Sequence, residues 1–201
     1  MSPRPRTRAD TDILDAAARV ISRLGPSRFT LADVAREAGL APATLLQRFG
    51  SKQGLLRAFA SQAAGRAAEA FAVPWPTDAS PLQVLLDRLA GLVRHLSSPA
   101  EMANNLAFLQ LDLSDPEFFR YAAAFHCTLR AEITALLQAA VASSELVPDV
   151  DARRLARAVH VAYNGSLLTW AVEQQAPLAD WLRQDLVFVL APYVTPGRGL
   201  A

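Results

Sequence analysis

The sequence lacks several features that mark common protein classes. It has one cysteine, Cys127, and no apolar run that approaches the roughly 18 residues of a membrane-spanning helix. A single cysteine cannot form a disulfide within the chain, and the N-terminus shows no basic segment followed by an apolar run and a cleavage site. These absences exclude a disulfide-rich scaffold and predict a cytoplasmic protein without membrane contact.

Motifs of catalysis and of cofactor binding are also missing. The sequence contains no glycine-rich phosphate loop and no Gly-x-Ser-x-Gly motif. Its three histidines, His95, His126 and His160, do not have the spacing of metal ligands on a helix. We therefore expect no cofactor, no metal ion and no enzymatic activity.

Positive charge is concentrated in the N-terminal third. Residues 1–66 carry ten arginines and Lys52, the only lysine, against five acidic residues, a net charge of +6. Residues 67–201 carry nine arginines against fourteen acidic residues, a net charge of −5. Because a polyanion is attracted to the first part and repelled from the second, nucleic acid is the natural partner of the N-terminal part.

Apolar residues recur at intervals of three and four along nearly the whole chain, which predicts an all-α protein. Glycine and proline end the expected helices, as at Gly25-Pro26 and Pro74-Trp75-Pro76. The expected helices span residues 11–24, 30–38 and 42–49, a longer stretch after Ser51, and residues 82–96, 101–111, 116–141, 151–174 and 178–193.

The segment from Thr30 to Phe49 has the local signals of two helices joined by a tight turn. Thr30 and Asp33 have the spacing of a capping box, in which each side chain bonds the backbone of the other. Gly39 allows the left-handed backbone of a sharp turn, and Pro42 suits a first helical position. The turn is about three residues long, which predicts a helix-turn-helix whose second helix can enter a major groove.

Residues 29–40 (FTLADVAREAGL) and 44–56 (TLLQRFGSKQGLL) resemble the DNA-binding domain of the TetR family of repressors. The capping residue, the turn glycine, Phe49 and the Ser51-Lys52 start of the next helix all fall at the family's spacing. The resemblance implies a homodimer that releases its operator when a small molecule enters a helical C-terminal domain. The expected domains are a helix-turn-helix domain at 10–55 and an effector-binding and dimerisation domain at 56–201. Residues 1–9 (MSPRPRTRA) are rich in proline and arginine and lack a large apolar run, so we expect a flexible arm there.

Carried over by position, the resemblance implies that Thr30 and Lys52 contact phosphates. The remaining DNA-binding residues come from the start and the outward face of the second helix: Ala41, Pro42, Ala43, Thr44, Leu46, Gln47 and Arg48.

Three of these residues depart from the family's pattern: Leu46 replaces the usual tyrosine, Arg48 the usual histidine and Ala41 the usual capping serine. Leu46 and Ala43 can meet thymine methyl groups, whereas Gln47 can pair with adenine and Arg48 with guanine or a phosphate.

The expected C-terminal domain offers a weaker pattern for a small-molecule site. Phe119, His126 and Ile133 recur every seven residues and so share one helix face. The preceding helix mixes amides with an aromatic ring, a composition typical of a pocket for a mainly apolar molecule. The expected ligand-binding residues are Asn104, Asn105, Phe108, Phe119 and His126. A histidine on an apolar face is also common in a simple core, and that interpretation stays open.

The last two expected helices are candidates for dimerisation. Residues 186–191 (LVFVLA) are apolar around the whole helix, so every side of this segment must be buried away from water. The candidate interface residues are Val159, Ala162, Ser166, Trp170, Leu186, Val189 and Leu190. Burial within one subunit is the alternative, and an activator or an architectural protein with the same DNA-reading helix is the alternative function.

Overall fold

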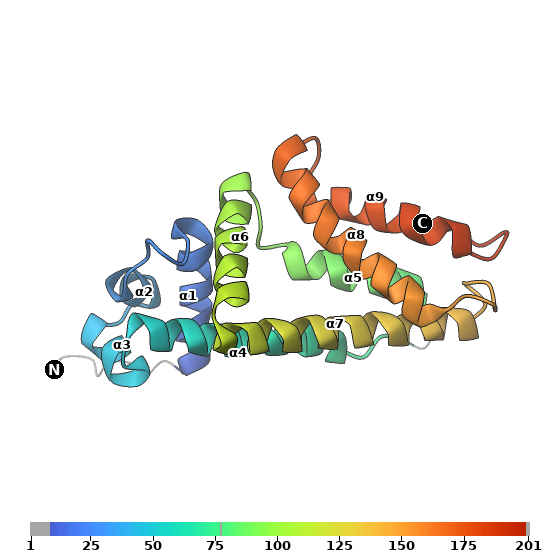
Figure 1. Ribbon diagram of the computed structural model, residues 1–201. Helices are drawn as coiled ribbons and strands as arrows, with labels where there is room; N and C mark the ends of the chain where they lie inside the picture. Colours follow the sequence, from blue (N-terminus) through green and yellow to red (C-terminus); the bar gives the residue numbers. More distant parts are fainter. Residues whose placement is uncertain (1–8, 77, 200–201) are drawn as a thin grey trace. The chain divides into compact units, whose positions relative to one another are not determined.

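The computed structural model describes residues 9–76 and 78–199. Over these residues the chain forms α-helices, one short 3-10 helix and no strand, apart from an isolated bridge between Leu146 and Val194, so the all-α prediction is confirmed (Figure 1). The helices are α1 (Asp10–Leu24), α2 (Leu31–Ala38), α3 (Pro42–Phe49), α4 (Lys52–Ala72), α5 (Pro81–Val93), α6 (Pro99–Ser114), α7 (Pro116–Ala142), α8 (Ala152–Glu173), α9 (Leu178–Leu190) and the 3-10 helix η1 (Ala191–Tyr193).

Capping side chains explain several helix ends that apolar periodicity alone places less well. The hydroxyl of Ser80 accepts a hydrogen bond from the backbone of Gln83, so α5 begins one residue earlier than expected. The hydroxyl of Ser98 accepts one from the backbone of Glu101, so α6 begins before Glu101. The expected arm at residues 1–9 lies, except for Ala9, outside the described residues.

The described helices divide into two compact units. The first contains residues up to Ala63 together with Ala103–Ala122, and the second contains Ala64–Met102 and residues from Ala123 onward. Helices α4, α6 and α7 therefore each contribute to both units. The proposed functional division at residue 55 stays a prediction, but the first compact unit reaches eight residues further and takes in most of α6 and the start of α7.

Each unit has its own apolar core. In the first unit, Ile13, Val20, Val34 and Leu45 from α1, α2 and α3 are fully buried together with Phe118 of α7. In the second unit, buried leucines and valines of α5, α7, α8 and α9 form one continuous cluster. In the part of the chain that the structure describes, no helix is both long enough and apolar enough to cross a lipid bilayer.

Candidate nucleic-acid interface

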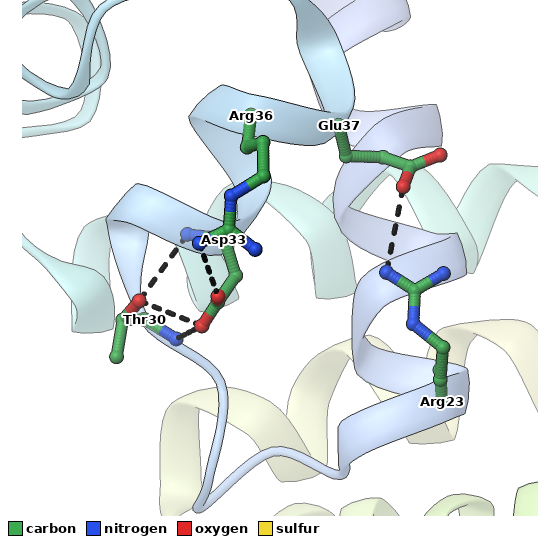
Figure 2. Close-up of polar contacts among 5 residues, drawn as sticks. All are labelled: Arg23, Thr30, Asp33, Arg36 and Glu37. Atoms are coloured by element: carbon green, nitrogen blue, oxygen red, sulfur yellow. Dashed lines mark hydrogen bonds and ion pairs between the residues drawn. The ribbon is translucent and has the colours of Figure 1, made fainter.

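The capping box at the start of α2 is formed as predicted (Figure 2). The Thr30 hydroxyl oxygen accepts from the backbone N–H of Asp33 at 3.2 Å, and the Asp33 carboxylate accepts from the backbone N–H of Thr30 at 2.9 Å. Hydrogen bonds from the side chain and backbone of Thr30, with the nearby Arg36 guanidinium, lower the pKa of Asp33. The exposed Thr30 is therefore held at the helix N-terminus by its reciprocal hydrogen bonds with the charged Asp33.

Two ion pairs that share Glu37 join α2 to α1. Glu37 accepts from Arg19 at 2.8 Å and from Arg23 at 3.4 Å, and Figure 2 shows the contact with Arg23. These arginines lower the pKa of Glu37, the hydrogen bond from Arg19 contributing most. The pairs are solvent-exposed, so they orient α2 more than they stabilise the fold.

The turn between α2 and α3 depends on Gly39. Its φ of 69° and ψ of 36° are left-handed, and this conformation lets the backbone N–H of Leu40 return to the carbonyl of Ala35 at 2.8 Å. Leu45 is then fully buried on the inner face of α3. The predicted helix-turn-helix is confirmed, and α3 has the residue range expected from the sequence.

The outer face of α3 is mostly apolar. Its exposed residues are Ala41, Pro42, Ala43, Leu46 and Gln47, and Thr44 is half-buried. Arg48 is also half-buried and donates to the carboxylate of Asp10 at 3.0 Å. The Arg48 side chain therefore ties α3 to the start of α1, a contact between residues 38 positions apart that apolar spacing does not predict.

Lys52 fastens the start of α4 to the loop before α2. Its ammonium group donates to the carbonyl of Ser27 at 2.7 Å and lies 4.5 Å from the centre of the Phe29 ring. One of its three N–H donors is used by the Ser27 bond. The half-buried position fixes a positive charge close to the N-terminus of α2.

Comparison with known proteins agrees with this geometry. The sequence model described as "Bacterial regulatory proteins, tetR family" matches residues 13–59, which span most of α1, all of α2 and α3 and the first turns of α4. Residues 13–59 form a TetR-family DNA-binding domain. The fold is that of a DNA-binding transcriptional regulator of the TetR type, with an N-terminal helix-turn-helix domain and a helical C-terminal domain. A search of curated protein sequences finds no match.

Solved structures of TetR-family and other transcriptional regulators share the fold over nearly the whole chain. A TetR regulator from Haloarcula marismortui has a TM-score of 0.76 and 19% identity, over 92% of this chain and 98% of that one. SmeT, the repressor of the Stenotrophomonas maltophilia multidrug efflux pump SmeDEF, has a TM-score of 0.68 and 21% identity, over 96% and 94%. A putative regulator from Saccharomonospora viridis in complex with choline has a TM-score of 0.73 and 21% identity, over 92% and 97%.

Four of the expected ligand-binding residues lie in the first compact unit. Asn104 donates to the carbonyl of Ser22 at 2.7 Å, and the Phe108 ring packs edge-on against Phe59 and Phe118. Asn105 and Phe119 are exposed. Asn104 and Phe108 therefore join α6 to α1 and α4 within the first unit. The fifth expected residue, His126, is not part of this unit.

His126 belongs to the second unit, where it meets His160 of α8. Nδ1 of His126 and Nε2 of His160 are 3.0 Å apart, a hydrogen bond that requires at least one neutral ring. Burial, with the neighbouring Arg130, lowers the pKa of His126. Burial and the charges of His126 and Arg130 lower the pKa of His160 to about 4. The spacing of the two histidines gave no signal for this pair, since they lie on different helices.

This histidine pair predicts a loss of stability in acid. In the unfolded chain both histidines take up protons near pH 6.5, whereas in the folded chain their pKa values are lower. The contribution of the pair to the free energy of unfolding is therefore full above pH 6.5 and is lost as the pH drops toward about 4. We expect the lowered pKa of His160 to reduce the free energy of unfolding by roughly 2 to 3 kcal/mol at the acid end of this window. Urea unfolding of the parent and of the double variant His126→Gln and His160→Gln, at pH 7.5 and 4.5, measures this effect. The parent should lose more stability on acidification, and equal losses would contradict the assignment.

The expected interface residues of α8 and α9 are largely covered within the single chain. Val159, Leu186 and Leu190 are fully buried, and Ala162 and Val189 are half-buried. Ser166 donates to the Asp185 carboxylate, and the indole N–H of Trp170 donates to the carbonyl of Ala176 at 2.9 Å. Their burial against their own subunit removes the need for a partner at these positions, although dimerisation through the two helices stays a prediction.

A different face of α8 is apolar and exposed. We call it the outer stripe: Val161, Gly165, Leu168 and Val172, at spacings of four, three and four residues. Val172 is 81% exposed, and Phe188 of α9 is 82% exposed. A Cβ added at Gly165 would meet no atom, so another helix can approach the stripe closely there. The spacing of these residues is visible in the sequence, but the apolar run at 186–191 is more continuous and gives the stronger sequence signal.

Proposed function

We propose that the chain is a homodimeric, ligand-responsive transcriptional repressor. The observation that carries the proposal is the helix-turn-helix, whose α3 presents an exposed outer face while its inner residue Leu45 is fixed in the core. Such a helix can enter a major groove without any change of fold. The proposed DNA-binding residues are Thr30, Ala41, Pro42, Ala43, Thr44, Leu46, Gln47, Arg48 and Lys52.

The dimer is proposed to form through α8 and α9. The outer stripe and Phe188 supply the apolar surface that such an interface buries, with Gly165 at the place of closest approach. Two copies related by a two-fold axis present two α3 helices, so the operator should be roughly palindromic, with half-sites about 34–36 Å apart.

A mainly apolar small molecule is proposed to bind the helical C-terminal domain, with His126 as the expected contact within the second unit, and to lower operator affinity. Support comes from α4, a single continuous helix that begins at Lys52 in the first unit and ends at Ala72 in the second. A tilt of α4 would move Lys52 relative to the DNA phosphate that it is proposed to contact. A tenfold release requires about 1.4 kcal/mol of difference in ligand affinity between the free and DNA-bound states.

Selection of DNA from a random pool, followed by footprinting, tests the proposal. The expected result is a two-fold symmetric protected site, bound by a dimer and released by an apolar ligand found by thermal-shift screening. Protection of one asymmetric half-site, or no sequence preference, would overturn it. Activation of transcription by the ligand-free protein bound upstream of a promoter would instead favour the alternative of an activator.

Replacing Lys52 should weaken binding to every DNA sequence. Loss of one phosphate contact per subunit is expected to make the slope of log affinity against log salt shallower by about one unit per subunit. Lys52→Gln is the informative variant, because it removes the charge and keeps a polar amide beside the carbonyl of Ser27 that Lys52 contacts. An unchanged slope in Lys52→Gln and in Lys52→Ala would limit Lys52 to its structural contact with the loop.

A further inference from the structure

The outer face of α3 offers DNA very few hydrogen-bonding groups. Ala43, Leu46 and Gln47 are exposed at relative positions i, i+3 and i+4, so they lie on one face of the helix. Leu46 is 53% exposed, an unusual state for a large apolar side chain in the middle of a helix-turn-helix. Arg48 is held by Asp10, and Thr44 is half-buried. Gln47 is therefore the one fully outward side chain of α3 that can hydrogen-bond a base.

We propose that Leu46 is a specificity-determining residue that reads the C5-methyl group of thymine in the major groove. This inference rests on the proposed function and names the feature of the operator that the same site recognises. The thymine methyl group is the only apolar group that the bases present in the major groove, and cytosine lacks it. An exposed leucine and an exposed alanine on one helix face match that group and no hydrogen-bonding base edge.

The neighbouring glutamine reinforces this choice of base pair. The amide of Gln47 can make two hydrogen bonds to adenine, and adenine pairs with thymine. Leu46 and Gln47 are adjacent along the chain, so they reach the same base pair or neighbouring ones. The centre of each half-site is therefore expected to consist of A·T pairs, with at least one thymine methyl packed against Leu46.

Uracil provides a direct test, because it has the hydrogen-bonding edge of thymine and lacks only the methyl group. In an operator selected from a random pool, each thymine of both half-sites is replaced in turn by deoxyuridine, and dissociation constants are measured at one salt concentration. At one or two positions the replacement should weaken binding about fourfold per half-site, the value of one buried methyl group. At the other positions affinity should stay within experimental error.

Two protein variants decide whether Leu46 is the side chain responsible. In Leu46→Ala the preference for thymine over uracil at the sensitive positions should fall to about one. In Leu113→Ala, which removes a leucine on α6 that is 68% exposed, the preference should stay about fourfold. Both variants are first compared with the parent by thermal unfolding, and each truncates only an exposed side chain.

The possible results of these experiments distinguish this inference from the proposed function on which it rests. Failure to select any DNA sequence overturns the proposed function and this inference together. Sequence-specific binding that is indifferent to every replacement of thymine by uracil overturns the inference alone. A thymine preference that persists in Leu46→Ala also overturns it, because the methyl group is then read by another side chain.

Discussion

Replacement of Val172 and Phe188 by glutamate is expected to convert the protein to a monomer that no longer holds its operator. These side chains are 81% and 82% exposed, so the single chain should tolerate the charges. In a dimer through α8 and α9 the same charges would be buried against an apolar surface, at a cost of several kcal/mol. Operator affinity should fall on the order of 100-fold or more, because a monomer loses the advantage of two linked half-site contacts.

Sedimentation velocity gives the oligomeric state, and titration with a labelled operator gives the affinity. Leu113→Glu is the matched control, since it places one charge on an exposed leucine outside the two helices and should leave the dimer intact. A double variant that still sediments as a folded dimer would place the interface elsewhere. Glutamate at Leu186 and Leu190 would be uninformative, since both are buried within their own subunit.

Phe118→Ala is expected to destabilise the first compact unit by about 3–5 kcal/mol, the usual cost of a buried phenylalanine. Phe118 is fully buried in the cluster that contains Ile13 and Leu45, and its ring packs edge-on against Phe108 at 6.0 Å. The variant should therefore unfold the helix-turn-helix at lower urea concentration, although Phe118 lies more than sixty residues beyond α3. Urea unfolding and amide hydrogen exchange of α1 and α2 measure the change.

The neighbouring residue supplies the control. Phe119 is 52% exposed, so Phe119→Ala should change the free energy of unfolding by about 0.5 kcal/mol or less. Hydrogen exchange in α1 that is equally slow in Phe118→Ala and in the parent would show that α7 does not support the DNA-binding helices.

The sequence was sufficient for the helices and for the DNA-binding segment because the decisive signals there are local. These signals determine the backbone within about four residues of their own positions. They are Gly39, Pro42 and the capping pair of Thr30 and Asp33, and each appears in the structure as expected. The outward face of α3 followed from the same local geometry.

Which surface covers which helix was harder to predict. Apolar periodicity shows that a helix has a face to bury, but it does not identify the partner. Trp170 and Leu186 are candidates for a subunit interface from the sequence but are buried within their own chain, and apolar spacing does not distinguish them from the exposed outer stripe. The hydrogen bond from Asn104 to Ser22 joins residues 82 positions apart, and no spacing rule connects them.

The distance along the chain between these two residues has a consequence for folding during synthesis. A ribosome that has released only α1 to α3 has not yet made Phe118, which completes their core, or Asn104, which binds the carbonyl of Ser22 near the end of α1. A side chain at Gly25 would bring its Cβ within 2.6 Å of the Asn104 amide oxygen, so α6 settles closely against that helix end. The DNA-binding helices therefore reach their full stability only after α6 and the start of α7 have emerged. Until then the residues that complete their core have not been synthesised.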